Sequence, residues 1–225
     1  MRRTIVVLAK APDESTGEMR SVMDAQAASC LHECFLLDTL EKATAVPDAD
    51  LVVCSATGDD LAFLQHVTPR WTSYVHGEGM DLGERINSCL EQVWNPGTAA
   101  IVIRADTPTL PARCLELAFD ALAADGVDLV VGPCGNGGWY LVGMSARHPE
   151  MLQGADWGDP RSIIDRAAEL GLGWFMLPAW RCIRTAEDLG VLRDEAEGSS
   201  LCYSAPRTRE FLCELGTKPG VPTEW

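Results

Sequence analysis

The sequence predicts an α/β fold, and three observations support that prediction. Short apolar runs rich in β-branched residues recur along the chain, separated by segments with helical spacing of their apolar residues. The stretch at residues 99–110 begins as an uninterrupted apolar run, which is typical of a strand buried on both faces of a sheet. The 225 residues suffice for one large domain with a full core. We expect a single domain over residues 1–197 and a C-terminal tail or wrap over residues 198–225, which lack strong periodicity.

In the first half of the chain, four strands alternate with helices. The third helix has Asp81 as its expected N-cap, and Glu84 stands three residues later in the capping-box position. Pro111 opens the fourth helix, because proline suits the first helical turn. The expected strands are residues 4–9, 51–55, 73–75 and a central strand from 99. The first expected helix starts near residues 19–21 and ends at 45, and the others are residues 59–66, 81–94 and 111–124.

In the second half, three further strands and two helices are expected. Thr185 is the expected N-cap of the last helix, with Asp188 in the capping-box position. Between two strands lies the glycine-rich sequence 134–138, which suits either a hairpin turn or a floor over which a sugar-like group can lie. The expected strands are residues 127–131, 139–143 and 173–177, and the helices are residues 161–170 and a segment that begins at residue 185.

Net charge and composition exclude several classes of function. The net charge of −15 and the isoelectric point near 4.6 create a negative field that repels nucleic acid and anionic membranes. No apolar run approaches the roughly eighteen residues of a membrane span, and Met1-Arg2-Arg3 leads directly into an expected strand, so we expect no signal peptide there. We expect a cytoplasmic protein with no nucleic-acid or membrane partner. The tryptophans leave room for an exposed apolar patch and hence for a homo-oligomer.

Asp106 stands where the central strand ends, and this position suggests a functional role. Ligands of open α/β sheets bind outside the carboxyl ends of the strands, so Asp106 can face a ligand or a metal ion there. The alternative is that Asp106 only caps the turn that follows. Lys10 and Arg20 bracket the loop after the first strand, where they either meet phosphates or are solvated surface charges.

The nine cysteines contain no Cys-x-x-Cys pair, so the spacing typical of zinc sites is missing. Five of them fall within apolar helix or strand patterns, where a thiol behaves as a small buried hydrophobe. Cys134 and Cys182 differ, because both stand where strands are expected to end, near the candidate site.

Seven motifs, taken together and in order, resemble the bacterial glycosyltransferase-like family often called selenodomain-associated transferase 1. The resemblance spans roughly residues 5–190. The family is similar to the GT-A nucleotide-diphospho-sugar transferase fold and to nucleotidyltransferases such as 2-phospholactate guanylyltransferase and molybdopterin guanylyltransferase. The motifs are residues 7–12 with Arg20, 35–40, 81–85, 106–110, 132–133 with 137–143, Trp157, and 185–189.

This resemblance implies a three-layer α/β/α sandwich with a mixed, mostly parallel sheet, and it implies roles for particular residues. A nucleotide would lie over the carboxyl end of the first strand, and Asp106 would hold Mg²⁺ or Mn²⁺ as a catalytic metal ligand. The phosphates would meet Lys10, Arg20 and Arg85, and the acceptor would be bordered by Gly137, Gly138, Trp139 and Trp157.

Three departures from the family pattern fall on this inferred site. The first loop closes with Glu18-Met19-Arg20-Ser21, where the family has Lys-Thr-Arg-Leu. The segment Cys182-Ile183-Arg184 replaces Asp-Val-Asp, and Gly135-Asn136 replaces Glu-Asp. Arg184 therefore occupies the place of an aspartate that shares the metal in related nucleotidyltransferases. Arg184 could weaken metal binding, or pair with Asp106 and replace the charge of the metal.

Three hypotheses about function follow. The first is a glycosyltransferase-like or nucleotidyltransferase-like enzyme, with Asp106 and Arg184 as catalytic residues, acting on a nucleotide or sugar-nucleotide donor and a small-molecule acceptor. The second is a catalytically silent binding or scaffold protein that has lost the metal site. The third is a repurposed enzyme with Cys134 or Cys182 at the site, where Arg184 would lower the pKa of the Cys182 thiol.

Overall fold

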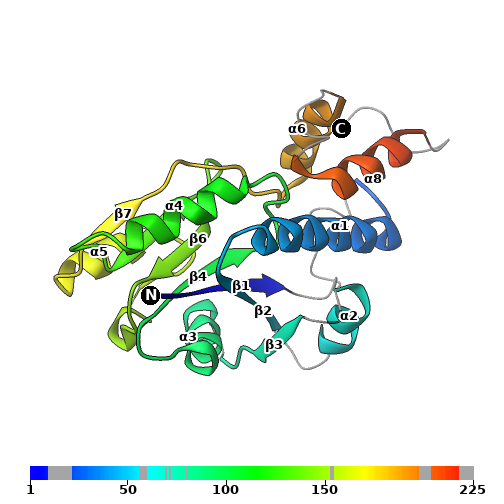
Figure 1. Cartoon of the computed structure of the whole chain (residues 1–225). Helices are drawn as coiled ribbons and strands as arrows, with labels where there is room; N and C mark the ends of the chain where they lie inside the picture. Colours follow the sequence, from blue (N-terminus) through cyan, green and yellow to red (C-terminus); the bar gives the residue numbers. More distant parts are fainter. Residues whose placement is uncertain are drawn as a thin grey trace.

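A mixed sheet of seven strands forms the centre of the molecule (Figure 1). The computed structural model describes residues 1–9, 22–55, 60–68, 70, 72–79, 81–152, 155–197 and 204–217. The strand order is β3-β2-β1-β4-β6-β5-β7, and β6 alone runs antiparallel to its neighbours β4 and β5. The strands are β1 (Arg2–Ala9), β2 (Ala49–Ser55), β3 (Ser73–His76), β4 (Thr98–Arg104), β5 (Leu129–Pro133), β6 (Trp139–Met144) and β7 (Trp174–Met176).

Helices cover both faces of the sheet and give the expected three layers. On one face, α1, α2 and α4 bury residues of β1 and β4 such as Ile5 and Ile103. On the other face, α3 and α5 pack against alternate residues such as Val6 and Val102. The helices are α1 (Ala25–Thr44), α2 (Asp60–Val67), α3 (Leu82–Val93), α4 (Ala112–Leu122), α5 (Pro160–Glu169), α6 (Ala186–Glu197) and α8 (Pro206–Thr217), with a short 3-10 helix, η2 (Pro149–Leu152).

The expected elements are confirmed to within a few residues at their ends. The carboxylate of Asp81 accepts the N–H of Glu84 at 2.8 Å and so caps α3. Thr185 and Asp188 cap α6 reciprocally, because each side chain accepts the backbone N–H of the other. None of the helices in the described part of the chain combines the length and apolar character needed to cross a bilayer.

Within the segment expected as a C-terminal tail or wrap, residues 206–217 form α8. This helix packs on the outer side of α1, together with α6 (Figure 1). Asp38 of α1 receives the first N–H groups of α8, from Arg207 at 3.2 Å and from Thr208 at 2.9 Å. The motif at residues 35–40 therefore includes a buried carboxylate that anchors the C-terminal helix.

Candidate active site

The centre of the candidate site is an ion pair between Arg104 and Asp106 at the carboxyl end of β4. Nε of Arg104 lies 3.1 Å from each carboxylate oxygen of Asp106, and Nη2 lies 2.8 Å from Oδ2. β4 ends at Arg104, and Asp106 lies in the turn that follows, two residues along the chain from its partner. Burial alone would lower the pKa of the Arg104 guanidinium, but the charge and hydrogen bonds of Asp106 outweigh it and raise that pKa. Arg104 therefore stays protonated and paired.

Asp106 does not cap the turn that follows it. The hydroxyl of Thr107 donates to the carbonyl of Arg104 at 3.0 Å, and the turn closes through backbone atoms. Lys42 of α1 supports the loop from outside by donating to the carbonyl of Pro108. The carboxylate of Asp106 is consequently directed to Arg104, away from its own backbone.

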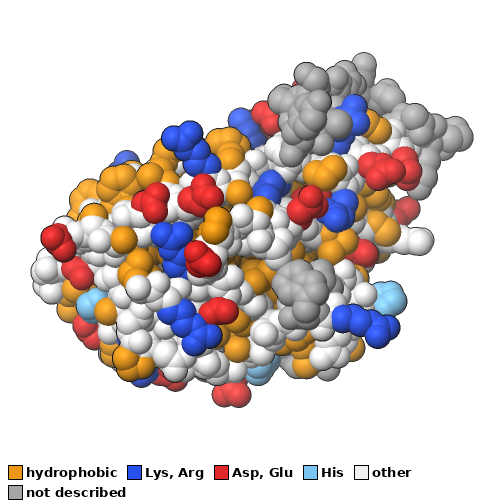
Figure 2. All heavy atoms as spheres, in the orientation of Figure 1, with side chains coloured by type: hydrophobic (Ala, Val, Ile, Leu, Met, Phe, Trp, Pro, Cys, Tyr) orange, Lys and Arg blue, Asp and Glu red, His pale blue; other side chains and the backbone are white. Residues whose placement is uncertain are grey.

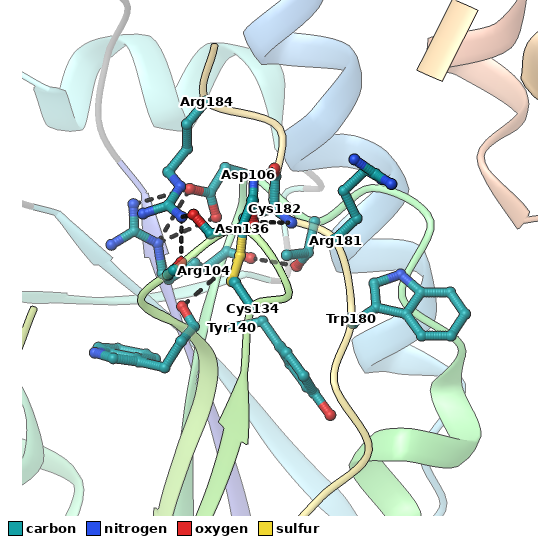
Figure 3. Close-up of a disulfide and its surroundings, with 12 residues drawn as sticks. Arg104, Asp106, Cys134, Asn136, Tyr140, Trp180, Arg181, Cys182 and Arg184 are labelled. Atoms are coloured by element: carbon teal, nitrogen blue, oxygen red, sulfur yellow. Dashed lines mark hydrogen bonds and ion pairs between the residues drawn. A yellow bond between two sulfur atoms is a disulfide. The ribbon is translucent and has the colours of Figure 1, made fainter. Parts of the chain in front are cut away.

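The guanidinium of Arg184 lies on the turn between β5 and β6. It does not pair with Asp106, which was one of the two alternatives for this residue. Its Nη2 donates to the carbonyls of Asn136, at 3.3 Å, and Gly137. The backbone holds the two segments together, because the N–H of Ile183 donates to the carbonyl of Asp106 at 2.8 Å. Figure 3 shows the side chains of Arg104, Asp106 and Arg184 on one side of the Cys134–Cys182 disulfide, with Trp180 and Arg181 on the other.

The glycine-rich sequence is a hairpin turn that also receives Arg184. Gly137 and Gly138 have φ angles of +91° and +72°, which side chains with a Cβ rarely adopt. A Cβ on Gly138 would stand 3.0 Å from Nη1 of Arg184. The hairpin-turn alternative for this sequence is therefore confirmed, whereas a floor for a sugar-like group stays a prediction.

Asn136 connects this turn to the start of α6. Its Nδ2 donates to the carbonyl of Cys182 and to Oδ1 of Asp188, both at 2.7 Å. Burial alone would raise the pKa of Asp188. Hydrogen bonds outweigh that effect and hold the pKa below its usual value; they come from the backbone N–H groups of Arg184 and Thr185 and from the side chains of Thr185 and Asn136. A buried, charged Asp188 thus fixes the backbone from which Arg184 extends.

Trp139 and Trp157 are almost completely buried, so their rings support the site from beneath. Arg104 lies over the ring of Trp139 at 5.9 Å, and the Trp139 indole N–H donates to the carbonyl of Trp157 at 2.5 Å. The Trp157 ring packs against Gly83 of α3, where a Cβ would meet its Cδ1 at 2.7 Å. These contacts link the Arg104–Asp106 pair to the N-terminus of α3.

Of the phosphate-binding candidates Lys10, Arg20 and Arg85, the described residues include Arg85. Nε of Arg85 donates to the carbonyl of Gly79 at 3.1 Å and so braces the loop before α3. Lys10 and Arg20 lie outside the described residues.

Cys134 and Cys182 form a disulfide, which corrects the expectation of a free thiol at the site. A second disulfide joins Cys54, at the end of β2, to Cys89 of α3. Residues 182–184 do not continue a strand, since β7 ends at Met176, and the Arg184 guanidinium lies on the hairpin turn. The structure therefore does not support thiolate chemistry at Cys134 or Cys182.

The donor set around Asp106 does not fit a divalent metal ion. Magnesium and manganese require carboxylate or other oxygen ligands, but both oxygens of Asp106 accept from Arg104. The described residues contain no group of three or more His, Cys, Asp or Glu side chains that could hold a metal. Arg184 adds a further positive charge on the same side of the disulfide as Asp106.

Sequence reasoning did not select Arg104. A signal was present, because Arg104 stands two residues before Asp106, close enough in the sequence for an ion pair. Asp188 was expected only as a capping residue, and its bond to Asn136, 52 positions away, required the tertiary structure.

Comparisons with known proteins place the chain in a family and identify its fold. The sequence profile of the family "Uncharacterized protein conserved in bacteria (DUF2064)" matches residues 39–159. No functionally curated protein matches the chain. A protein of Desulfovibrio desulfuricans G20, provisionally described as a nucleotide-diphospho-sugar transferase, is 25% identical with a TM-score of 0.83, covering 95% of this chain and 94% of that chain.

Two more distant structures share the fold alone. A cytidylyltransferase from Leptospira borgpetersenii is 13% identical with a TM-score of 0.59, covering 95% of this chain and 94% of its own. Rv0371c from Mycobacterium tuberculosis, solved as a complex with manganese, is 15% identical with a TM-score of 0.56, covering 85% of this chain and 98% of its own. The α/β fold is therefore that of nucleotide-diphospho-sugar transferases and nucleotidyltransferases.

Proposed function

Because the chain belongs to the DUF2064 family of proteins conserved in bacteria and has a nucleotide-diphospho-sugar transferase fold, we propose that it is a transferase. Its substrates are a nucleotide or sugar-nucleotide donor and a small-molecule acceptor. The observation that carries the proposal is the convergence of the Arg104–Asp106 pair and Arg184 at the carboxyl end of β4. Ligands of open α/β sheets bind at this edge.

Transfer of a nucleotidyl or glycosyl group leaves negative charge on phosphate oxygens. Catalysis of such reactions depends mainly on positioning and on cations aimed at that charge. Arg104 and Arg184 are suited to this role because a guanidinium stays protonated and binds phosphate through paired N–H groups. Asp106 would act as the positioning residue of Arg104, while Lys10, Arg20 and Arg85 would bind phosphates over the nucleotide half of the sheet.

The acceptor would lie beside the turn at Gly137 and Gly138, where the lack of side chains allows close approach. Trp139 and Trp157 would shape this side of the site through packing, since both rings are buried.

A thermal-shift and calorimetric survey of nucleoside triphosphates and sugar nucleotides tests the proposal. We expect one nucleotide class to bind, and ³¹P NMR to show consumption of that donor when acceptors are added. Asp106→Ala should retain the fold and lose turnover. Unchanged turnover in this variant would contradict the role of Asp106, and the absence of binding by every nucleotide would contradict the proposed function.

A second candidate is a catalytically silent binding protein of the same fold. It is favoured by one observation, which is that Arg104 already occupies both carboxylate oxygens of Asp106. Nucleotide binding without any donor consumption across the acceptor survey would support this candidate over the transferase.

A further inference from the structure

We infer that this site binds a diphosphate group through Arg104 and Arg184 and does not use a divalent metal ion for that purpose. The inference rests on the proposed function, because it assigns a diphosphate-bearing ligand to the same site. It also assigns Arg104 as a ligand-binding residue.

The Arg104–Asp106 pair makes this carboxylate a poor ligand for a metal ion. Three N–H···O contacts of 2.8 to 3.1 Å join the two groups, and both side chains are largely shielded from solvent. A cation that coordinated Asp106 would have to displace a guanidinium held by charge and by two parallel hydrogen bonds. Such a bidentate pair in a partly buried position is much less easily exchanged than a surface ion pair.

Arg184 brings a positive charge that no carboxylate neutralises within the described part of the chain. Its guanidinium donates to the neutral carbonyls of Asn136 and Gly137, while its own backbone N–H is bound to Asp188. These contacts fix the direction of the side chain and leave its charge for a ligand.

Together, Arg104, Arg184 and Asp106 carry a formal charge of about +1, in a chain with a net charge of −15. Figure 2 shows acidic and basic side chains interspersed over one face of the molecule. A local excess of guanidinium groups at the carboxyl end of a central strand is suited to a diphosphate, whose oxygens match the planar donors of arginine.

Inorganic pyrophosphate is the probe for this inference, because it contains the diphosphate without base or sugar. We expect isothermal titration calorimetry to give the same pyrophosphate affinity, within about twofold, in EDTA and in Mn²⁺. Arg104→Gln and Arg184→Gln should each weaken it by about tenfold or more, since each removes charged hydrogen bonds. Arg147→Gln is the matched control, because Arg147 pairs with Glu91 and adjoins Gly97 and Thr98 at the opposite end of β4.

Asp106→Asn distinguishes diphosphate binding by the arginines from diphosphate binding through a metal ion on Asp106, because the two predict opposite changes in pyrophosphate affinity. If the arginines bind the diphosphate, removing the carboxylate charge keeps or increases pyrophosphate affinity. If a metal bound to Asp106 were required, the same substitution would abolish binding. Titration of Mn²⁺ alone, followed by electron paramagnetic resonance, should show no site that is lost in Asp106→Asn.

Three results would overturn the inference. They are pyrophosphate binding that requires Mn²⁺, a Mn²⁺ site that Asp106→Asn removes, or no pyrophosphate binding in either condition. The nucleotide survey separates these results from failure of the proposed function. Nucleotides that bind only with Mn²⁺ would leave the proposed function standing, whereas no binding of any nucleotide in EDTA or Mn²⁺ would overturn both.

Discussion

Nδ2 of Asn136 donates to Oδ1 of Asp188 at 2.7 Å, and this bond joins the β5–β6 turn to the first turn of α6. The other oxygen of Asp188 accepts the backbone N–H groups of Arg184 and Thr185 at 3.1 and 3.0 Å. One carboxylate thus satisfies three donors and sets the position of Arg184.

Asp188→Ala should lower the free energy of unfolding by about 2–3 kcal/mol, because it removes a buried charged acceptor and leaves these donors unsatisfied. Urea denaturation measures the change. The matched control is Glu187→Ala, an exposed acidic residue in the same helical turn, which should cost less than about 0.5 kcal/mol. Equal effects of the two substitutions would show that the contacts of Asp188 contribute nothing specific.

The same carboxylate predicts a pH dependence of stability. The pKa of Asp188 is lower in the folded chain than its usual value, so its contribution is complete above the unfolded pKa of about 3.9 and is lost as the pH falls through the lower folded pKa. The stability difference between the wild type and Asp188→Asn should therefore shrink as urea denaturation is repeated from pH 6 to below pH 4. A difference that stays constant over that range would contradict this assignment. Glu187→Gln serves as the control.

Gly138→Ala should both strain the backbone and displace Arg184. Gly126→Ala isolates the first effect, since Gly126 also has a positive φ, of +79°, but open space where a Cβ would stand. We expect each substitution to cost about 1 kcal/mol or more of stability, and only Gly138→Ala to weaken pyrophosphate binding. Denaturation and calorimetry separate the two effects. Equal binding by both variants would argue against a role for Arg184.

Asp38→Ala should release α8 from α1. The substitution removes the acceptor for the N–H groups of Arg207 and Thr208 and a buried partner of the Arg207 guanidinium. We expect hydrogen exchange of the amides in residues 206–217 to become at least about tenfold faster, which corresponds to a loss of about 1.4 kcal/mol. Glu41→Gln, which changes the exposed partner of Arg207, should have a much smaller effect. Unchanged exchange in Asp38→Ala would contradict the anchoring role.

The Cys134–Cys182 disulfide should contribute about 2–4 kcal/mol to stability under oxidising conditions, because it closes a loop with a sequence separation of 48. The double variant Cys134→Ser/Cys182→Ser should lose that contribution, and its stability should depend less on reductant than that of the wild type. Cys30→Ser, at an exposed free cysteine, is the control. Peptide mapping without reduction should recover the linked pair, and its recovery as two free thiols would disprove the assignment.

The sequence by itself predicted the elements of the fold and the position of the candidate site. Periodicity, prolines and capping residues act within one or two helical turns, so they predicted the strands, the boundaries of α3, the start of α6 and the position of Asp106 after the central strand. The resemblance to a transferase family supplied the layer arrangement, which the sheet order confirms.

Only the tertiary structure decided which groups pair at the site. One alternative placed Arg184 on Asp106, but Arg104 already pairs with that carboxylate, and the hairpin carbonyls hold Arg184. The docking of α8 on Asp38 and the partner of each disulfide cysteine also depend on contacts across the chain. Such contacts follow from strand order and register, which bring distant residues together, whereas sequence periodicity reports only the neighbours within one element.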